Sequence, residues 1–195
     1  MISTLMKRRS SIRHFDNKPI SKANINKILN SARLSPSIGN SQPWVFGVIT
    51  NKKEINAISE ASYKQIWINN SPLLITLCSD ISDTNETLKN IVYKRFPSLE
   101  NYISKIDNSI YSYLFSCEHQ TKIPGSIMML QALELGIYST WTTYFDVLKV
   151  SEILNLPSQY LPSEIIAFGY PKKEMKMTPK KDINEIVFYD KFGSE

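Results

Sequence analysis

Pro36-Ser37-Ile38-Gly39-Asn40-Ser41-Gln42-Pro43-Trp44 is the stretch that most restricts how this chain folds. Its two prolines and its glycine predict an irregular loop, because these residues favour turns over regular structure. Upstream, apolar residues spaced along one helix face predict an amphipathic helix that ends at Ser35, since the residue before a proline disfavours the helical conformation. Downstream, Trp44 to Ile49 predicts a buried strand. A polar loop between a helix and a strand is a common ligand site, and a plain connection is the alternative.

A second constraint is the basic stretch Arg9-Ser10-Ser11-Ile12-Arg13. Arg9 and Arg13 are four residues apart, so at a helix end or in a tight turn both side chains face one way. Two guanidinium groups and two hydroxyls that converge in this way suit a phosphate, which arginine binds through two parallel hydrogen bonds. The alternative is a solvated helix terminus, because the run Lys7-Arg8-Arg9 alone is typical of an exposed helix end.

The composition predicts a single globular domain over residues 1–195, with 42% hydrophobic and 21% charged residues. The formal net charge of +5 is compatible with nucleic-acid binding. The sequence, however, has no zinc-ligand spacing, no RNA-binding aromatic signature and no recognisable helix-turn-helix. Its basic residues cluster at 7–13 and 172–181, which fits two contacts to a phosphorylated small molecule at least as well. We therefore expect neither a nucleic acid nor a metal as a ligand.

The cysteines and the apolar runs of the sequence predict the cellular compartment of the protein. Cys78 and Cys117 are too few for a disulfide framework and are interpreted as buried free thiols in a reducing compartment. No apolar run approaches the roughly 18 residues that span a bilayer. Met1 to Lys7 lacks the apolar core of a signal peptide. We expect a cytoplasmic protein with no membrane partner.

Helical and strand patterns alternate along the rest of the chain. Residues 53–63 predict a helix, Leu73–Cys78 a strand, Gly125–Leu135 a helix that ends at Gly136, Ile137–Tyr144 a strand, and Glu164–Pro171 a strand and turn. Residues 80–122 predict two helices. Their tyrosines and phenylalanines either line an aromatic substrate pocket or pack these helices onto the body, and the sequence does not decide between the two.

The two N-terminal motifs together resemble those of the FMN-dependent nitroreductase family. Members of that family typically carry R-[RHS]-S-x-[RK] near the start and P-S-x-x-N-x-Q-P-W after the next helix, and residues 9–13 and 36–44 match both in order. Pro124 to Thr143 is similar to the family's second flavin-contacting unit, except that Ile137-Tyr138 stands where Leu-Gly is usual. The resemblance covers nearly the whole chain and is weakest over residues 80–122.

The resemblance implies an α+β fold, with a central mostly antiparallel sheet flanked by helices. It also implies an intertwined homodimer whose C-terminal segment crosses to the partner, and a variable helical region, residues 80–122, over the active site. A Rossmann fold is disfavoured, because the sequence lacks G-x-G-x-x-G.

By the same resemblance, FMN binds at the subunit interface. Residues 9–13 of one chain would hold its phosphate, ribityl chain and pyrimidine edge, and residues 36–40 would come from the partner. Backbone groups around Thr142 and Thr143 would address the ring, with Gln65 nearby. Lys180 stands where relatives commonly carry a phosphate-binding arginine, and a lysine keeps the charge but loses the fork. The expected cofactor-binding residues are Arg9, Ser10, Ser11, Arg13, Pro36, Ser37, Ile38, Asn40, Gln65, Thr142, Thr143 and Lys180.

The resemblance implies an NAD(P)H oxidoreductase in which FMN carries the chemistry. NADH or NADPH would deliver a hydride, and a nitroaromatic, a quinone or a similar electron-poor substrate would take two electrons in a ping-pong cycle. No Ser-His-Asp set or carboxylate pair is apparent, so no catalytic side chain is expected beyond an electrostatic role for Arg13. Two alternatives stay open: another flavin reaction on this fold, such as dehalogenation or flavin breakdown, and a non-enzymatic basic binding module.

Overall fold

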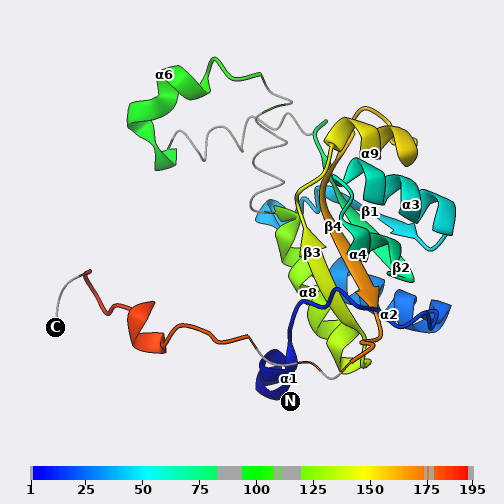
Figure 1. Cartoon of the computed structure of the whole chain (residues 1–195). Coiled ribbons are helices and arrows are strands. Elements are labelled where there is room, and N and C mark those ends of the chain that lie inside the picture. Colours follow the sequence, from blue (N-terminus) through cyan, green and yellow to red (C-terminus); the bar gives the residue numbers. More distant parts are fainter. Residues whose placement is uncertain are drawn as a thin grey trace.

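Four antiparallel strands form the centre of the fold in a computed structural model (Figure 1), which describes residues 2–82, 94–107, 110, 120–173, 175 and 178–192. The strands are β1 (Trp44–Ile49), β2 (Leu73–Asp80), β3 (Tyr138–Thr142) and β4 (Tyr160–Gly169). They lie in the order β1-β2-β4-β3, and every neighbouring pair is antiparallel. The predicted α+β class with a central antiparallel sheet is therefore confirmed.

Helices cover both faces of this sheet (Figure 1). α2 (Lys22–Arg33) and α8 (Lys122–Glu134) pack on one face, and α3 (Lys52–Ala61), α4 (Ile66–Asn69) and α9 (Val147–Ile153) pack on the other. α1 (Ile2–Arg8) lies against α8. Short helical turns are η1 (Ile38–Asn40), η2 (Pro97–Leu99), α6 (Glu100–Ile103) and η4 (Ile183–Glu185).

The helix boundaries follow local signals in the sequence. Ser21 caps α2, because its hydroxyl accepts the backbone N–H of Asn24 at 3.3 Å. Asn51 caps α3 in the same way, by accepting the backbone N–H of Lys53 at 2.8 Å. α8 ends before Gly136, whose φ of 73° is the left-handed conformation that glycine adopts without strain. The predicted helices at 53–63 and 125–135 are thus confirmed within a few residues.

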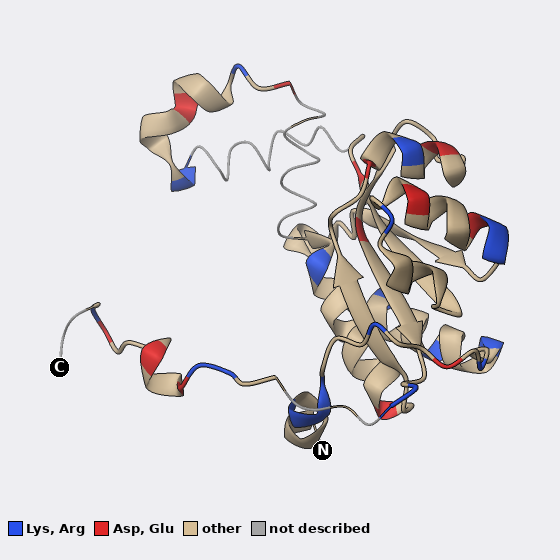
Figure 2. Ribbon diagram, viewed as in Figure 1, with Lys and Arg blue, Asp and Glu red and all other residues tan. Residues whose placement is uncertain are grey.

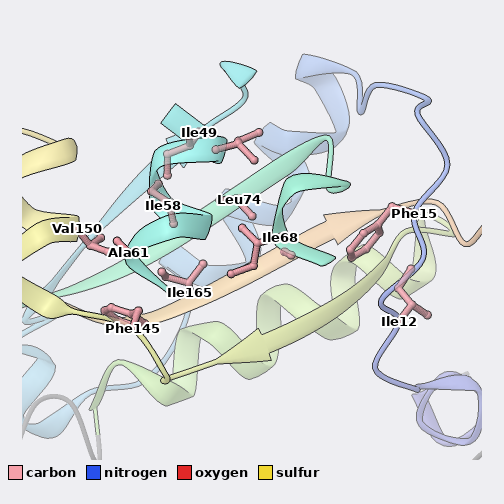
Figure 3. Close-up of a cluster of buried hydrophobic side chains, with 12 residues drawn as sticks. Ile12, Phe15, Ile49, Ile58, Ala61, Ile68, Leu74, Phe145, Val150 and Ile165 are labelled. Atoms are coloured by element: carbon pink, nitrogen blue, oxygen red, sulfur yellow. The ribbon is translucent and has the colours of Figure 1, made fainter. Parts of the chain in front are cut away.

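Strand β4 separates two hydrophobic cores. Ile165 and Ala167 face α3, α4 and α9, and Figure 3 shows this core with Ile12 and Phe15 of the N-terminal segment at one end. Ile166 and Phe168 face the second core, between the sheet and helices α2 and α8. This alternation is the period of two expected for a strand that is buried on both faces.

The prediction that residues 44–49 form a buried strand is wrong in one respect. β1 does run from Trp44 to Ile49, but only Ile49 is buried and Val48 is exposed. The physical reason is its place at the edge of the sheet, where one side has no neighbour among the described strands. An open groove of about 580 Å³ lies there, lined by residues of α2 and by Gln42, Trp44, Val45 and Phe46.

The C-terminal segment after β4 passes α1 and then extends away from the sheet (Figure 1). Large apolar side chains are exposed along it: Ile183, Ile186, Val187, Phe188, Tyr189 and Phe192. Within the described residues, no helix combines the length and apolar character that crossing a bilayer requires. About half of the 80–122 region lies outside the described residues, including Tyr93, Tyr111, Tyr113 and Phe115 of its predicted aromatic pocket, and so does Cys117. Phe96 and Tyr102 of that region are described and exposed. Cys78 is a buried free thiol, as predicted.

Candidate functional site

The basic stretch 9–13 lies beside β3. Ser11 forms a parallel bridge with Ser139, and the backbone N–H of Ile12 donates to the carbonyl oxygen of Ser139 at 3.2 Å. The hydroxyl of Thr140 donates to the carbonyl oxygen of Ile12. The expected helix end is confirmed for Arg9, which follows α1 directly and donates its backbone N–H to the carbonyl oxygens of Leu5 and Met6. It does not extend over the whole stretch, because Ser11 and Ile12 pair with the sheet edge.

Pairing with β3 places polar and charged groups on this edge. Ser10 and Ile12 are buried, whereas Ser11 and Arg13 between and after them are exposed. The Ser10 hydroxyl has no hydrogen-bond partner among the described residues, although a buried hydroxyl normally has one. Arg9 lines a hollow of about 230 Å³ together with Met6, Ser126, Met129 and Leu130 of α1 and α8.

The charges of this segment have no acidic partner among the residues that the structure describes. Within the described part of the chain, neither Arg9 nor Arg13 forms an ion pair. Figure 2 shows the basic residues gathered where α1 ends. Two uncompensated guanidinium groups and an unpartnered buried hydroxyl form a donor set that fits a phosphorylated ligand.

Gln65 and Thr142 meet further along β3. The Gln65 amide nitrogen donates to the Thr142 hydroxyl at 3.2 Å and to the carbonyl oxygen of Tyr144 at 2.7 Å. The backbone N–H of Tyr144 in turn donates to the Thr142 hydroxyl at 3.1 Å. Thr140 and Thr142 share one face of β3, so this group lies about 7 Å from the Ile12 contact. The structure thus brings residues 9–13, Gln65 and Thr142 to one strand, with Thr143 exposed beside them.

An exposed aromatic pair borders this group. The rings of Tyr63 and Tyr144 have centroids 4.4 Å apart, and both side chains are exposed. Tyr63 and Lys64 have φ values of 54° and 57°, in the left-handed region that residues other than glycine rarely adopt. Backbone strain of this kind often accompanies functional sites. Neither residue stood out in the sequence.

The loop 36–42 forms a curled turn. The backbone N–H of Gln42 donates to the Ser37 hydroxyl at 2.9 Å, and the Gln42 amide nitrogen donates to the carbonyl oxygen of Asn40 at 3.1 Å. Gly39, Asn40 and Gln42 have φ values of 57°, 57° and 48°. Pro36, Ile38 and Asn40 are exposed, and Ser37 is half-buried. The backbone N–H of Ile38 donates to the side-chain oxygen of Gln120 at 3.2 Å.

This loop and the basic stretch lie at opposite ends of β4. Ser139, beside Ser11, pairs with Phe168 near the end of the strand. Pro43 accepts a hydrogen bond from Asp80, which pairs with Tyr160 at its start. At a rise of about 3.3 Å per residue, these positions are roughly 25 Å apart. One chain therefore does not bring the two motifs together.

Lys180 is the remaining expected residue. It is exposed in the C-terminal segment, and no hydrogen bond or ion pair joins it to another described residue.

Glu164 is a buried carboxylate that the sequence interpretation missed. Its side chain is 0% exposed, lies 3.7 Å from the Lys122 ammonium group, and accepts the indole N–H of Trp141. Trp141 also packs against Gly125, where an added Cβ would lie 2.5 Å from the indole ring. These contacts fix the strand residue that precedes Thr142. A charged residue inside an apolar strand was the signal that could have indicated Glu164.

Comparison with known proteins shows the family to which this chain is similar. A model of the Nitroreductase family matches residues 6–170. A protein of Thermus thermophilus named NADH dehydrogenase is 25% identical, with 93% of this chain and 92% of the relative covered. A protein of Bacillus subtilis named FMN reductase [NAD(P)H] is 22% identical over 87% of this chain and 66% of its own. The structure of an FMN-dependent nitroreductase of Clostridium difficile matches with a TM-score of 0.73 and 26% identity, over 96% of this chain and 98% of that chain. The chain belongs to the Nitroreductase family.

Proposed function

We propose that this protein is an FMN-dependent NAD(P)H oxidoreductase, formed as one domain over residues 1–195 and working in the cytoplasm. The observation that carries the proposal is the buried hydroxyl of Ser10, next to two arginines; within the described part of the chain, the hydroxyl has no hydrogen-bond partner and the arginines have no acidic partner. Such a set can donate several hydrogen bonds to an anionic ligand. The matching family, and relatives named for FMN and NAD(P)H, support FMN as that ligand.

The chain's own residues bind and orient. Arg9 and Ser10 would hold the phosphate, and Ser11 and Arg13 would address the ribityl chain and the pyrimidine edge of the ring. The Thr142–Thr143 backbone and Gln65 would lie along the ring, with Lys180 as a further phosphate contact. When bound, FMN supplies two-electron hydride transfer from NADH or NADPH to an electron-poor acceptor such as a nitroaromatic or a quinone. The exposed Tyr63–Tyr144 pair supports a planar acceptor, because aromatic rings stack on flat ligands.

We further propose that the site is completed by a second chain. Residues 36–40 lie roughly 25 Å from the basic stretch of their own chain, at the rise per residue of a strand, so they would serve the partner's cofactor. α8 also carries apolar residues on the side away from the sheet, and Ile127, Met129 and Leu130 are only half-buried in a single chain. A helix that is apolar all round is normally covered on all sides. A homodimer would cover it.

Replacing Ser10 with alanine tests the cofactor proposal. Removing a buried hydroxyl without a partner relieves a desolvation cost, so apo Ser10→Ala should unfold at the same temperature as the wild type or higher. Its affinity for FMN should fall about tenfold, because one hydrogen bond to a charged group is lost. Ser163→Ala is the matched control, since that buried hydroxyl donates to the carbonyl oxygen of Leu77 at 3.0 Å and its loss should destabilise the apo protein.

The wild-type measurements decide the function itself. Heat or acid should release equimolar FMN from the reconstituted protein, and NADH or NADPH should be oxidised when a quinone or a nitroaromatic is added. Release of FAD, or no flavin binding after reconstitution, would overturn the proposal. If the protein binds FMN but does not oxidise NADH or NADPH, the assignment of the cofactor would stand and the proposed oxidoreductase reaction would be overturned.

A further inference from the structure

The loop 37–42 has a strained backbone that hydrogen bonds within the loop hold in a tight curl. Asn40 and Gln42 are in the left-handed region without being glycine, a strained conformation that persists only where the surrounding structure holds it. The bonds within the loop, from Gln42 to Ser37 and to Asn40, fix its curl. They do not fix its position relative to the sheet.

Gln120 supplies that position. Its side-chain oxygen accepts the backbone N–H of Ile38 at 3.2 Å, across 82 residues of sequence. In the part of the chain that the structure describes, it is the only hydrogen bond to residues 37–42 from a residue distant in sequence. The other bond from outside the loop is local, from the backbone N–H of Trp44 in β1 to the carbonyl oxygen of Gln42 at 2.8 Å. η1 lies beside the N-terminal end of α8, where Gln120 is found (Figure 1).

Gln120 is itself held firmly by the sheet. Its side chain is 2% exposed. The next residue, Thr121, is bonded at 3.0 Å to the hydroxyl of Ser163 in β4, and Ser163 bonds to the Leu77 carbonyl oxygen in β2. Lys122 then lies 3.7 Å from the buried Glu164 carboxylate. The amide of Gln120 therefore projects from a fixed base.

We propose that Gln120 is a positioning residue for the cofactor: its amide oxygen fixes the loop 37–42 in the conformation that binds FMN. The inference rests on the proposed function, because the loop's role toward FMN belongs to it. Gln120 acts through the Ile38 backbone and touches no reacting atom. Loss of the acceptor should free the loop to relax its strained residues and move it from the binding position.

Two variants distinguish the effect of the amide oxygen from the effect of the side-chain volume. Gln120→Met keeps the volume and removes the acceptor, whereas Gln120→Glu keeps an oxygen at the same place. Gln131→Ala, within α8, is the control, since among the described residues its amide bonds only the exposed Glu134, at 2.7 Å. The measurements are the amide exchange rate of Ile38 in the apo proteins and the affinity for FMN in the reconstituted ones.

In Gln120→Met, the Ile38 amide should exchange about tenfold faster than in the wild type, and FMN affinity should fall about tenfold, the effect of one lost hydrogen bond. Gln120→Glu should restore both values to within about threefold, a difference below one hydrogen bond, and Gln131→Ala should match the wild type.

Unchanged Ile38 exchange in Gln120→Met would overturn the tether. Faster exchange with unchanged FMN affinity would overturn the positioning role. A wild-type protein that does not bind FMN would instead overturn the proposed function. The titration of the wild type gives this result before any variant is compared.

Discussion

Arg9 and Arg13 leave the same short stretch of backbone but reach different surroundings. Arg9 is half-buried in the hollow between α1 and α8, and Arg13 is exposed past the bridge between Ser11 and β3. We propose that Arg9 meets the phosphate of FMN and Arg13 the ring. A charge near the ring discriminates between its oxidised and reduced forms, whereas a charge near the phosphate does not.

Arg13→Ala should weaken FMN binding about ten- to a hundredfold, because a charge-assisted hydrogen bond contributes about 1.5–3 kcal/mol. The midpoint potential of bound FMN should also fall, by about 30 mV for each 1.4 kcal/mol of lost preference for the reduced form. Arg9→Ala should lose affinity while its potential stays near that of the wild type. Redox titration of both variants, saturated with FMN, measures the difference. Equal potentials in all three proteins would leave Arg13 only a binding role.

Cys78 gives a pH-dependent prediction that is independent of the cofactor. Burial raises the pKa of its thiol from 9.0 to about 12. Between these values the unfolded chain releases the thiol proton and the folded chain keeps it, so the contribution of Cys78 to stability is lost as the pH rises. The difference in unfolding free energy between the wild type and Cys78→Ala should therefore shrink by about 1.4 kcal/mol for each unit above about pH 9. Urea titrations at a series of pH values measure this difference, and one independent of pH would contradict the burial of the thiol.

At the scale of elements, Gly125 determines how closely α8 approaches β3. An added Cβ there would lie 2.5 Å from the Trp141 ring and 3.0 Å from the Leu77 side chain. Gly125→Ala should therefore lower the unfolding free energy by about 1–3 kcal/mol, the usual effect of overpacking a core. Gly47→Ala is the control, because its Cβ would meet neighbours at an ordinary 3.7 Å. Chemical denaturation compares the two, and equal stabilities would contradict the tight contact.

The elements themselves were largely predictable from sequence, because their signals are local. The cap at Ser21, the apolar face of α2 and the glycine after α8 all act within one or two helical turns. Whether a strand lies at the edge or in the centre of the sheet was not predictable from local signals. Trp44–Ile49 is as apolar as a buried strand, and only the strand order shows that it has one neighbour.

The candidate site divides in the same way. The motifs at 9–13 and 36–44 were recognisable because each is a short run of sequence, and their place in the family is now confirmed. The contacts of Gln120 with Ile38 and of Glu164 with Trp141 join positions 82 and 23 residues apart, and no local pattern encodes them. The role of each expected FMN-binding residue stays a prediction.

At the scale of the whole molecule, the C-terminal segment carries large aromatic side chains that a single chain leaves exposed. Phe188 and Phe192 have ring centroids 5.4 Å apart and are 56% and 88% exposed, so a single chain buries little of either. Exposed aromatic side chains on an extended segment favour docking on another chain. This agrees with the proposal that each cofactor site takes residues from two chains.

Replacing both rings, in Phe188→Ser/Phe192→Ser, should therefore spare the fold of the chain and weaken the dimer. Full burial of one phenylalanine contributes about 1.5–3 kcal/mol, so the two changes should raise the dimer dissociation constant at least a hundredfold. Leu148→Ser, at an exposed residue of α9 outside the segment, is the control and should leave the dimer intact. Sedimentation over a concentration series measures the association, and FMN titration at the same concentrations measures binding. Because residues 36–40 would come from the partner, FMN affinity should fall as the dimer dissociates. A monomer that binds FMN as tightly as the wild type would contradict the shared site.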